Sequence, residues 1–184
     1  CYQYKYDSRN RLVEKKLPGK QWEYIVYDKL DRVVATGPAF PPFSDLVKSG
    51  WMITKYDVYN RPILTGWMSS AATINSALRK TRQDERDAQT ANLSESRTDS
   101  TPDVTISGIT YRYSNLAIPT SGYHVLTVNY YDDYGFDLAG GVSETAGGIS
   151  PITNVKGLAT GSRIRTLGTT LWTTNVQYYD AKGR

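Results

Sequence analysis

The sequence predicts a mainly β protein, an antiparallel ribbon of β-hairpins with one helical insertion. Three observations support this fold class. A Tyr-Asp dipeptide recurs five times with a similar sequel, 15 Tyr and 4 Trp accompany only 3 Phe, and one central stretch lacks aromatic residues altogether. Tyrosine favours half-buried pleated surfaces because its ring packs across neighbouring strands. The composition therefore argues against both a helical bundle and a disordered chain.

The repeated unit is a six-residue motif that begins with Tyr-Asp. Its copies are Tyr6-Asp7-Ser8-Arg9-Asn10-Arg11, Tyr27-Asp28-Lys29-Leu30-Asp31-Arg32, Tyr56-Asp57-Val58-Tyr59-Asn60-Arg61, Tyr131-Asp132-Asp133-Tyr134-Gly135-Phe136 and Tyr179-Asp180-Ala181-Lys182-Gly183-Arg184. The spacing between copies is unequal, which indicates one supersecondary unit with inserted material and not a regular solenoid. The fourth copy ends in Phe where the others end in Arg.

The fifth position of the motif defines its geometry. It is occupied only by Asn, Asp or Gly, the residues that tolerate a positive φ. These residues are Asn10, Asp31, Asn60, Gly135 and Gly183. The Asp at the second position can accept a backbone N–H bond from two residues further on, which favours a turn. Each copy is therefore predicted to form a type I turn that ends in a left-handed bulge residue.

The residues around each motif alternate as strands do. The alternating positions are Trp22, Tyr24 and Val26 before the second copy and Val125, Thr127 and Asn129 before the fourth, and the return strands begin at Leu12-Val13, Val33-Val34 and Ile63-Leu64. Residues 1–66 are therefore expected to form three hairpin units. Residues 103–184 are expected to add further strands and two motifs, with the last hairpin cut off.

Residues 67–102 are predicted to form a helical insertion followed by a polar linker. Ser69 and Ser70 are suitable N-caps, and an apolar stripe at helical spacing follows them. The stripe consists of Ala71, Ile74, Ala77 and Leu78. Beyond Thr81 the sequence becomes polar, so we expect a helix of two to four turns starting near Ser69, then a mobile linker through Ser100.

A glycine-rich stretch at 139–148 is expected to be a flexible connector. It lacks the Gly-Lys-Ser/Thr ending that a phosphate-binding loop requires.

The composition excludes several functional classes. The 22 basic and 18 acidic residues are dispersed, so no nucleic-acid interface is expected. No apolar run reaches the roughly 20 residues of a membrane helix. With one cysteine, Cys1, and one histidine, His124, the chain offers neither an internal disulfide nor a Cys/His zinc cage. We therefore expect no catalytic residue, metal or cofactor, and a structural role for His124 in its strand-like surroundings.

Three alternatives concern the motif residues and the aromatic surface. The motif aspartates could bind calcium, but isolated carboxylates within turns favour turn capping. The arginines could recognise phosphate or sugar, but stacking on tyrosine or pairing with an acid along the ribbon is favoured. Exposed tyrosine and tryptophan rings could bind glycan, whereas cross-strand pairing is the structural interpretation.

Tyr-Asp-x-x-Gly/Asn-Arg, placed between one strand and the next, resembles the YD motif of the Rhs family. The run from Cys1 to Gly19, and the segment Trp22-Glu-Tyr-Ile-Val-Tyr-Asp28, are similar to the large Rhs-repeat proteins of Bacteroidetes. The resemblance covers both ends of the chain, whereas 69–105 matches only loosely. The fourth copy departs from the pattern at Phe136, although its turn at Gly135 is expected to form.

The resemblance implies a long β-sheet ribbon that spirals into a hollow shell. Such shells enclose a C-terminal toxin in polymorphic toxin systems, and related proteins present adhesive surfaces. The expected protein is a secreted or cell-surface bacterial protein, and this chain a structural segment of it. Its expected partners are the remainder of its own longer chain, an encapsulated toxin or secretion machinery, and glycan in the adhesive alternative. No Asp-Pro-x-Gly-Leu sequence is present, so the family's self-cleaving aspartyl site is not carried over.

Overall fold

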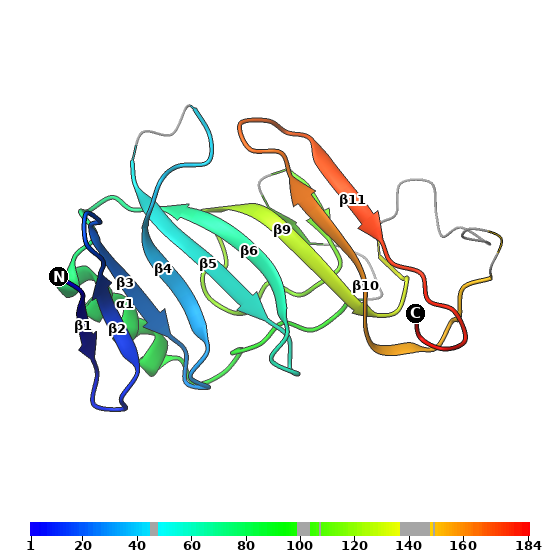
Figure 1. The fold of residues 1–184 in the computed structure, drawn as a ribbon, viewed down its shortest axis with the longest axis horizontal. Helices are drawn as coiled ribbons and strands as arrows, with labels where there is room; N and C mark the ends of the chain where they lie inside the picture. The colour runs from blue at the N-terminus through cyan, green and yellow to red at the C-terminus, as the bar shows by residue number, and fades with distance from the viewer. Residues whose placement is uncertain (45–47, 99–103, 107, 137–147, 149) are drawn as a thin grey trace.

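The computed structural model describes residues 1–44, 48–98, 104–106, 108–136, 148 and 150–184. Nine strands form one antiparallel sheet in the order β1-β2-β3-β4-β5-β6-β9-β10-β11 (Figure 1). These strands are β1 (Gln3–Tyr6), β2 (Leu12–Lys16), β3 (Trp22–Tyr27), β4 (Val33–Ala39), β5 (Gly50–Tyr56), β6 (Pro62–Ser69), β9 (Tyr123–Asp132), β10 (Val155–Arg165) and β11 (Trp172–Val176). The predicted mainly β, antiparallel fold class is therefore confirmed.

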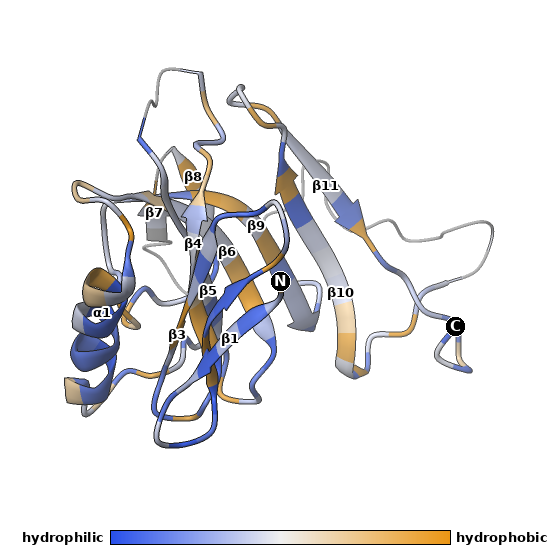
Figure 2. Ribbon diagram, turned by 60° about the vertical axis from the view of Figure 1, so that its left-hand side comes forward, coloured by the Kyte–Doolittle hydropathy of each residue, from blue (hydrophilic) through white to orange (hydrophobic). Residues whose placement is uncertain are grey.

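The chain forms the sheet as a meander with one insertion. Strands that follow one another in sequence are neighbours in the sheet, except that residues 70–122 lie between β6 and β9. This inserted segment contains α1 (Ser76–Ala88) and a small two-stranded sheet of β7 (Val104–Ile106) and β8 (Ile109–Tyr111). Figure 2 shows α1 against one face of the large sheet. The insertion is therefore a second layer over that face.

The main core lies between the large sheet and the insertion. Trp51 and Ile53 point from alternate positions of β5 to this side, as strand geometry requires. Tyr111 and Tyr113 of the insertion pack against them, and all four side chains are almost completely buried. A smaller apolar cluster of Phe43, Trp67 and Leu126 forms separately. Aromatic rings thus supply much of the apolar burial.

Strands were predicted correctly on both sides of the first three motifs, whereas the start of the helix was wrong. Ser69 is still part of β6, where it pairs with Gly50. The Ser70 hydroxyl donates to the carbonyl of Ala72, and the helix is capped instead by Asn75, whose side chain accepts from Leu78 N–H at 2.9 Å. The strand ladder therefore keeps the two serines out of the helix.

The polar stretch after Thr81, predicted as a linker, is helical through Ala88. Gln83 explains why, because its buried side chain docks α1 onto β3. Its Oε1 accepts from Tyr27 N–H at 3.0 Å, and its Nε2 donates to the Tyr27 carbonyl at 2.9 Å. A polar helix face is thereby held on the sheet through hydrogen bonds to the backbone. No helix in the described part of the chain is long and apolar enough to cross a membrane.

Replacing Gln83 with Ala should destabilise the protein by about 1–3 kcal/mol, because two partly buried backbone groups of Tyr27 lose their partner. Chemical denaturation measures the change in the free energy of unfolding. Asp84→Ala is the matched control on the same helix, since its exposed pair with Lys80 contributes little. Equal effects of the two substitutions would contradict this account of helix docking.

Candidate functional site

The motif turns lie at the same end of the strands of the sheet, at the bottom of the view in Figure 1. In each complete turn the fifth residue donates its N–H to the carbonyl of the motif Asp, as Asn10 does to Asp7 at 3.0 Å. The residues at this position have positive φ in four copies: Asn10 at 58°, Asp31 at 60°, Asn60 at 63° and Gly183 at 74°. The ladder also shifts register at the first, second and third turns. The predicted left-handed residue is confirmed in these four copies, and the predicted bulge in the first three.

The motif Asp fixes both the turn and the motif Arg. In the second copy, Asp28 Oδ1 accepts from Leu30 N–H at 2.9 Å and Arg32 N–H at 3.0 Å, and Asp28 Oδ2 accepts from Arg32 Nε at 2.7 Å. The same three contacts occur at Asp7 with Arg11, Asp57 with Arg61 and Asp180 with Arg184. The aspartates of these four copies are therefore turn caps, as expected, whereas Asp132 of the fourth copy accepts from Arg61 and from Gly157 N–H instead.

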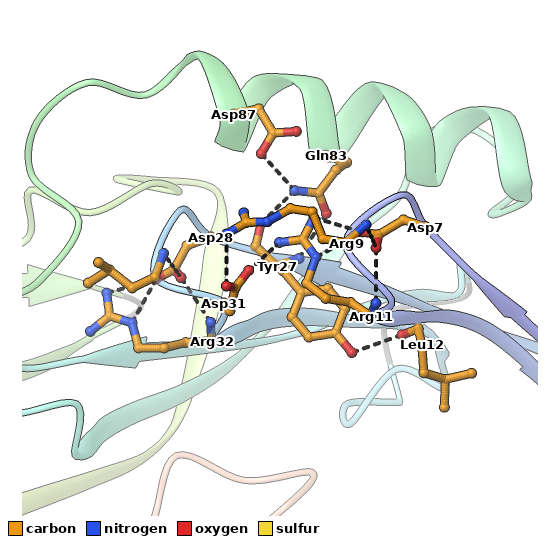
Figure 3. A network of polar contacts seen from close by, with 11 residues as sticks. Asp7, Arg9, Arg11, Leu12, Tyr27, Asp28, Asp31, Arg32, Gln83 and Asp87 are labelled. Atoms are coloured by element: carbon orange, nitrogen blue, oxygen red, sulfur yellow. Dashed lines mark hydrogen bonds and ion pairs between the residues drawn. The ribbon is translucent and has the colours of Figure 1, made fainter.

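The motif Arg is also covered by the Tyr of the next copy. The guanidinium carbon lies 4.8, 4.8 and 4.4 Å from the ring centroid in the pairs Arg11–Tyr27, Arg32–Tyr56 and Arg61–Tyr131. Each of these tyrosines donates its hydroxyl to the carbonyl of the residue that follows the Arg: Leu12 at 2.8 Å, Val33 at 2.7 Å and Pro62 at 3.1 Å. Figure 3 shows the first of these arrangements.

A third contact completes the connection between copies. Arg11 Nη1 donates to Asp31 Oδ1 at 2.9 Å, and Arg32 Nη1 donates to Asn60 Oδ1 at 3.0 Å, so the Arg of one copy bonds the fifth residue of the next. We call this set of contacts between successive copies a junction. The sequence indicated the turn role of the fifth position but not this second role, which depends on the register between hairpins.

The fourth copy differs from the prediction at Gly135, which does not have a positive φ. Instead Asp132 has a φ of 75°, and Asp133 Oδ1 accepts from Gly135 N–H at 2.8 Å. The cause is Phe136, which is buried and stacks on Tyr130 with ring centroids 4.3 Å apart. An apolar side chain in place of the outward Arg therefore draws the chain inward, and the expected turn does not form.

At the fourth copy, two ion pairs replace the contacts that the fifth residue and the motif Arg make in the other copies. Arg61 donates to both carboxylate oxygens of Asp132, so Asp132 takes the part that the fifth residue has at the earlier junctions. Arg97 of the insertion donates to Asp133 and lies over the Tyr130 ring at 5.2 Å, which supplies the guanidinium that this copy lacks. Both acidic side chains are thus engaged by arginine.

The single histidine lies among aromatic side chains. The His124 ring centroid is 5.2 Å from that of Phe43 and 6.1 Å from that of Trp67. In the described ranges of the chain, no three His, Cys, Asp or Glu side chains are grouped so that they could hold a metal ion. Apart from Gly148 and Ser150 onward, the stretch following Phe136, with most of the expected glycine-rich connector, lies outside the described residues.

Comparison with known proteins gives no relative: no family model, no curated protein and no solved structure matches this chain. The functional argument therefore rests on the geometry of the junctions.

Asn60→Val should destabilise the protein more than Asn60→Gly, by about 1–2 kcal/mol, because a branched Cβ opposes the left-handed conformation. Both substitutions remove the Oδ1 acceptor of Arg32, so their difference isolates the backbone effect. The two free energies of unfolding, measured by denaturant titration, test this. If the Val variant is as stable as the Gly variant, the assigned role of the positive φ is wrong.

The junction should also weaken in acid. Hydrogen bonds from Arg61 lower the pKa of Asp132 below its ordinary value of 3.8, against the opposing effect of burial and with help from Gly157 N–H. Because the folded-state pKa is the lower one, the stabilisation is complete above the unfolded pKa. It is lost as the pH falls through the folded-state pKa.

The free energy of unfolding, measured from about pH 6 to about pH 3, should therefore decline less steeply for Asp132→Asn than for the unsubstituted chain. Identical slopes would show that the Arg61–Asp132 pair contributes nothing to the acid sensitivity.

Proposed function

We propose that this chain is a structural segment of a secreted or cell-surface protein of the Rhs, or YD-repeat, type, and that it builds part of a β-sheet wall. The wall belongs to a shell that encloses a C-terminal toxin. The residues that carry this function are those of the motif turns, which hold neighbouring hairpins together. On this proposal the chain is not an enzyme.

The observation that supports the proposal is the recurrence of one junction geometry between successive hairpins. Three consecutive copies are joined to the next by an Arg under a Tyr ring and by a Tyr hydroxyl on a backbone carbonyl. A contact set that repeats from hairpin to hairpin specifies how a further hairpin adds to the sheet. Such repeated contacts are more typical of an extended structural sheet than of a domain built around a single binding site.

The edge strand β1 supports the same interpretation. It has one neighbour in the sheet, and its Tyr6 is 60% exposed, whereas Tyr27 and Tyr56 are partly buried beneath the preceding Arg. Tyr6 stands at the motif position that receives an Arg in later copies. The remainder of a longer chain, carrying one more turn, is the partner that fits this edge.

A carbohydrate-binding or partner-binding adhesion module is the alternative, and one groove favours it. This groove, of about 790 Å³, is lined by Trp22, Lys20, Glu23 and Phe40, among others. Phe40 is 89% exposed there. Aromatic rings beside polar side chains suit the stacking of a sugar face.

Electron cryo-microscopy of the longer polypeptide that contains this segment tests the wall proposal. The expected result is one continuous sheet around a cavity, with a neighbouring strand on β1 and an Arg against Tyr6. A free-standing domain with β1 uncovered would overturn it. For the alternative, glycan-array binding that is lost in Phe40→Ala and kept in Tyr59→Ala, an exposed residue at a turn outside this groove, would favour adhesion.

A further inference from the structure

A lysine, a glutamate and an asparagine meet beneath the sheet, where the insertion covers it. Lys55 follows Trp51 and Ile53 on the inward side of β5, and its side chain is almost completely buried. Its Nζ lies 2.9 Å from Glu95 Oε1 and 2.5 Å from Asn115 Oδ1. An amine is thus held against a carboxylate and a carboxamide at the same time.

The carboxamide is fixed by contacts on both of its heteroatoms. Asn115 Oδ1 accepts from the Tyr123 hydroxyl at 2.8 Å, and Asn115 Nδ2 donates to the Thr120 carbonyl at 2.6 Å. The Tyr123 ring also lies 5.2 Å from Lys55 Nζ. A hydroxyl that donates to the amide oxygen polarises the carbonyl group and stabilises negative charge that develops on that oxygen.

The carboxylate is held equally firmly. Glu95 is completely buried, and it accepts from Ser114 Oγ at 2.6 Å, Leu116 N–H at 2.8 Å and Ala117 N–H at 3.0 Å, in addition to Lys55. These contacts aim one oxygen at Lys55 Nζ, within reach of a proton transfer.

We propose that Lys55 and Asn115 become joined by an intramolecular isopeptide bond, with Glu95 as the proton carrier. Because a carbonyl bond is about 1.2 Å long, Nζ at 2.5 Å from Oδ1 lies within about 3.7 Å of Asn115 Cγ. This separation approaches that of a near-attack geometry. The proposal does not depend on the function proposed above.

The reaction requires no added reagent. Glu95 takes a proton from the Lys55 ammonium, and burial helps this step because it lowers the pKa of Lys55. The neutral amine attacks Asn115 Cγ to form a tetrahedral centre whose oxygen receives the Tyr123 hydrogen bond. Glu95, now a carboxylic acid, gives its proton to Nδ2 and then takes the surplus proton from the attacking nitrogen. The Cγ–Nζ bond has formed, the Cγ–Nδ2 bond breaks, and ammonia leaves as ammonium with the last proton.

The bond would link two layers of the molecule. Lys55 belongs to the sheet and Asn115, 60 residues further on, to the insertion, so the link closes a long loop of chain. Closure of a long loop restricts the unfolded state. The single cysteine of the sequence offers no disulfide for this purpose.

Intact mass spectrometry of the purified chain tests the proposal directly. The folded protein should be lighter than its sequence mass by about 17 Da, the mass of ammonia. After trypsin digestion, residues 49–79, uncleaved at Lys55 and at the Arg61–Pro62 bond, should be found joined to residues 113–156. A chain of full mass that is cleaved after Lys55 and yields residues 113–156 unattached would overturn the proposal.

Variants assign the roles. Asn115→Ala should keep its full mass, and so should Glu95→Gln, whereas Asn129→Ala, an amide that bonds the Pro62 carbonyl, should still lose ammonia. Glu95→Gln can fail to fold because its carboxylate is buried, so circular dichroism accompanies each measurement and Asn115→Ala serves as the second test. Loss of about 17 Da in folded Asn115→Ala would refute the assignment.

Discussion

The arginine that ends each of the first three motifs is the group on which the arrangement of hairpins depends. Arg32 bonds its own Asp28, is covered by Tyr56, and donates to Asn60 and to the backbone of Asp57. A planar guanidinium with five donors can meet all these demands, whereas the ammonium of lysine cannot. Because a single side chain binds its own turn and the next one, neighbouring hairpins have a fixed register at the end of the sheet where the motif turns lie.

The insertion is attached to the sheet by polar contacts as much as by apolar packing. Arg32 reaches the Leu93 carbonyl and Ser94, Gln83 bonds both backbone groups of Tyr27, and Glu95 receives Lys55. The first two of these attachments meet the motif turns or the strand that precedes one. The motif turns therefore bind both neighbouring hairpins and the layer that covers the sheet. A helix with a largely polar surface can dock beside them through such hydrogen bonds.

The local parts of this architecture could be predicted from sequence, and the distant ones could not. Asn10, Asp31 and Asn60 indicate their turns because φ tolerance is a property of the residue itself. The helix cap at Asn75, by contrast, depends on how far β6 continues, and Gly135 lost its turn to the burial of Phe136. The alternation of Lys55 with Trp51 and Ile53 places it on the inward face of its strand. The sequence does not reveal the buried Glu95 and Asn115 that bond it there, because they come from the distant insertion. In the candidate site, the stacking of motif arginines on tyrosine was expected from the sequence, but the copy that supplies each ring follows from register, which a single sequence does not reveal.

The hydroxyl of each junction tyrosine is received by a main-chain oxygen, which every amino acid possesses. Leu12, Val33 and Pro62 serve equally well at that place. Neighbouring hairpins thus recognise one another without constraining the residue type there, and the rest of each strand is left to adapt to its own surroundings. Whole hairpins can therefore be added or removed by gene duplication and deletion, because each hairpin carries both the Tyr that contacts the preceding copy and the Arg and backbone carbonyl that receive the next one.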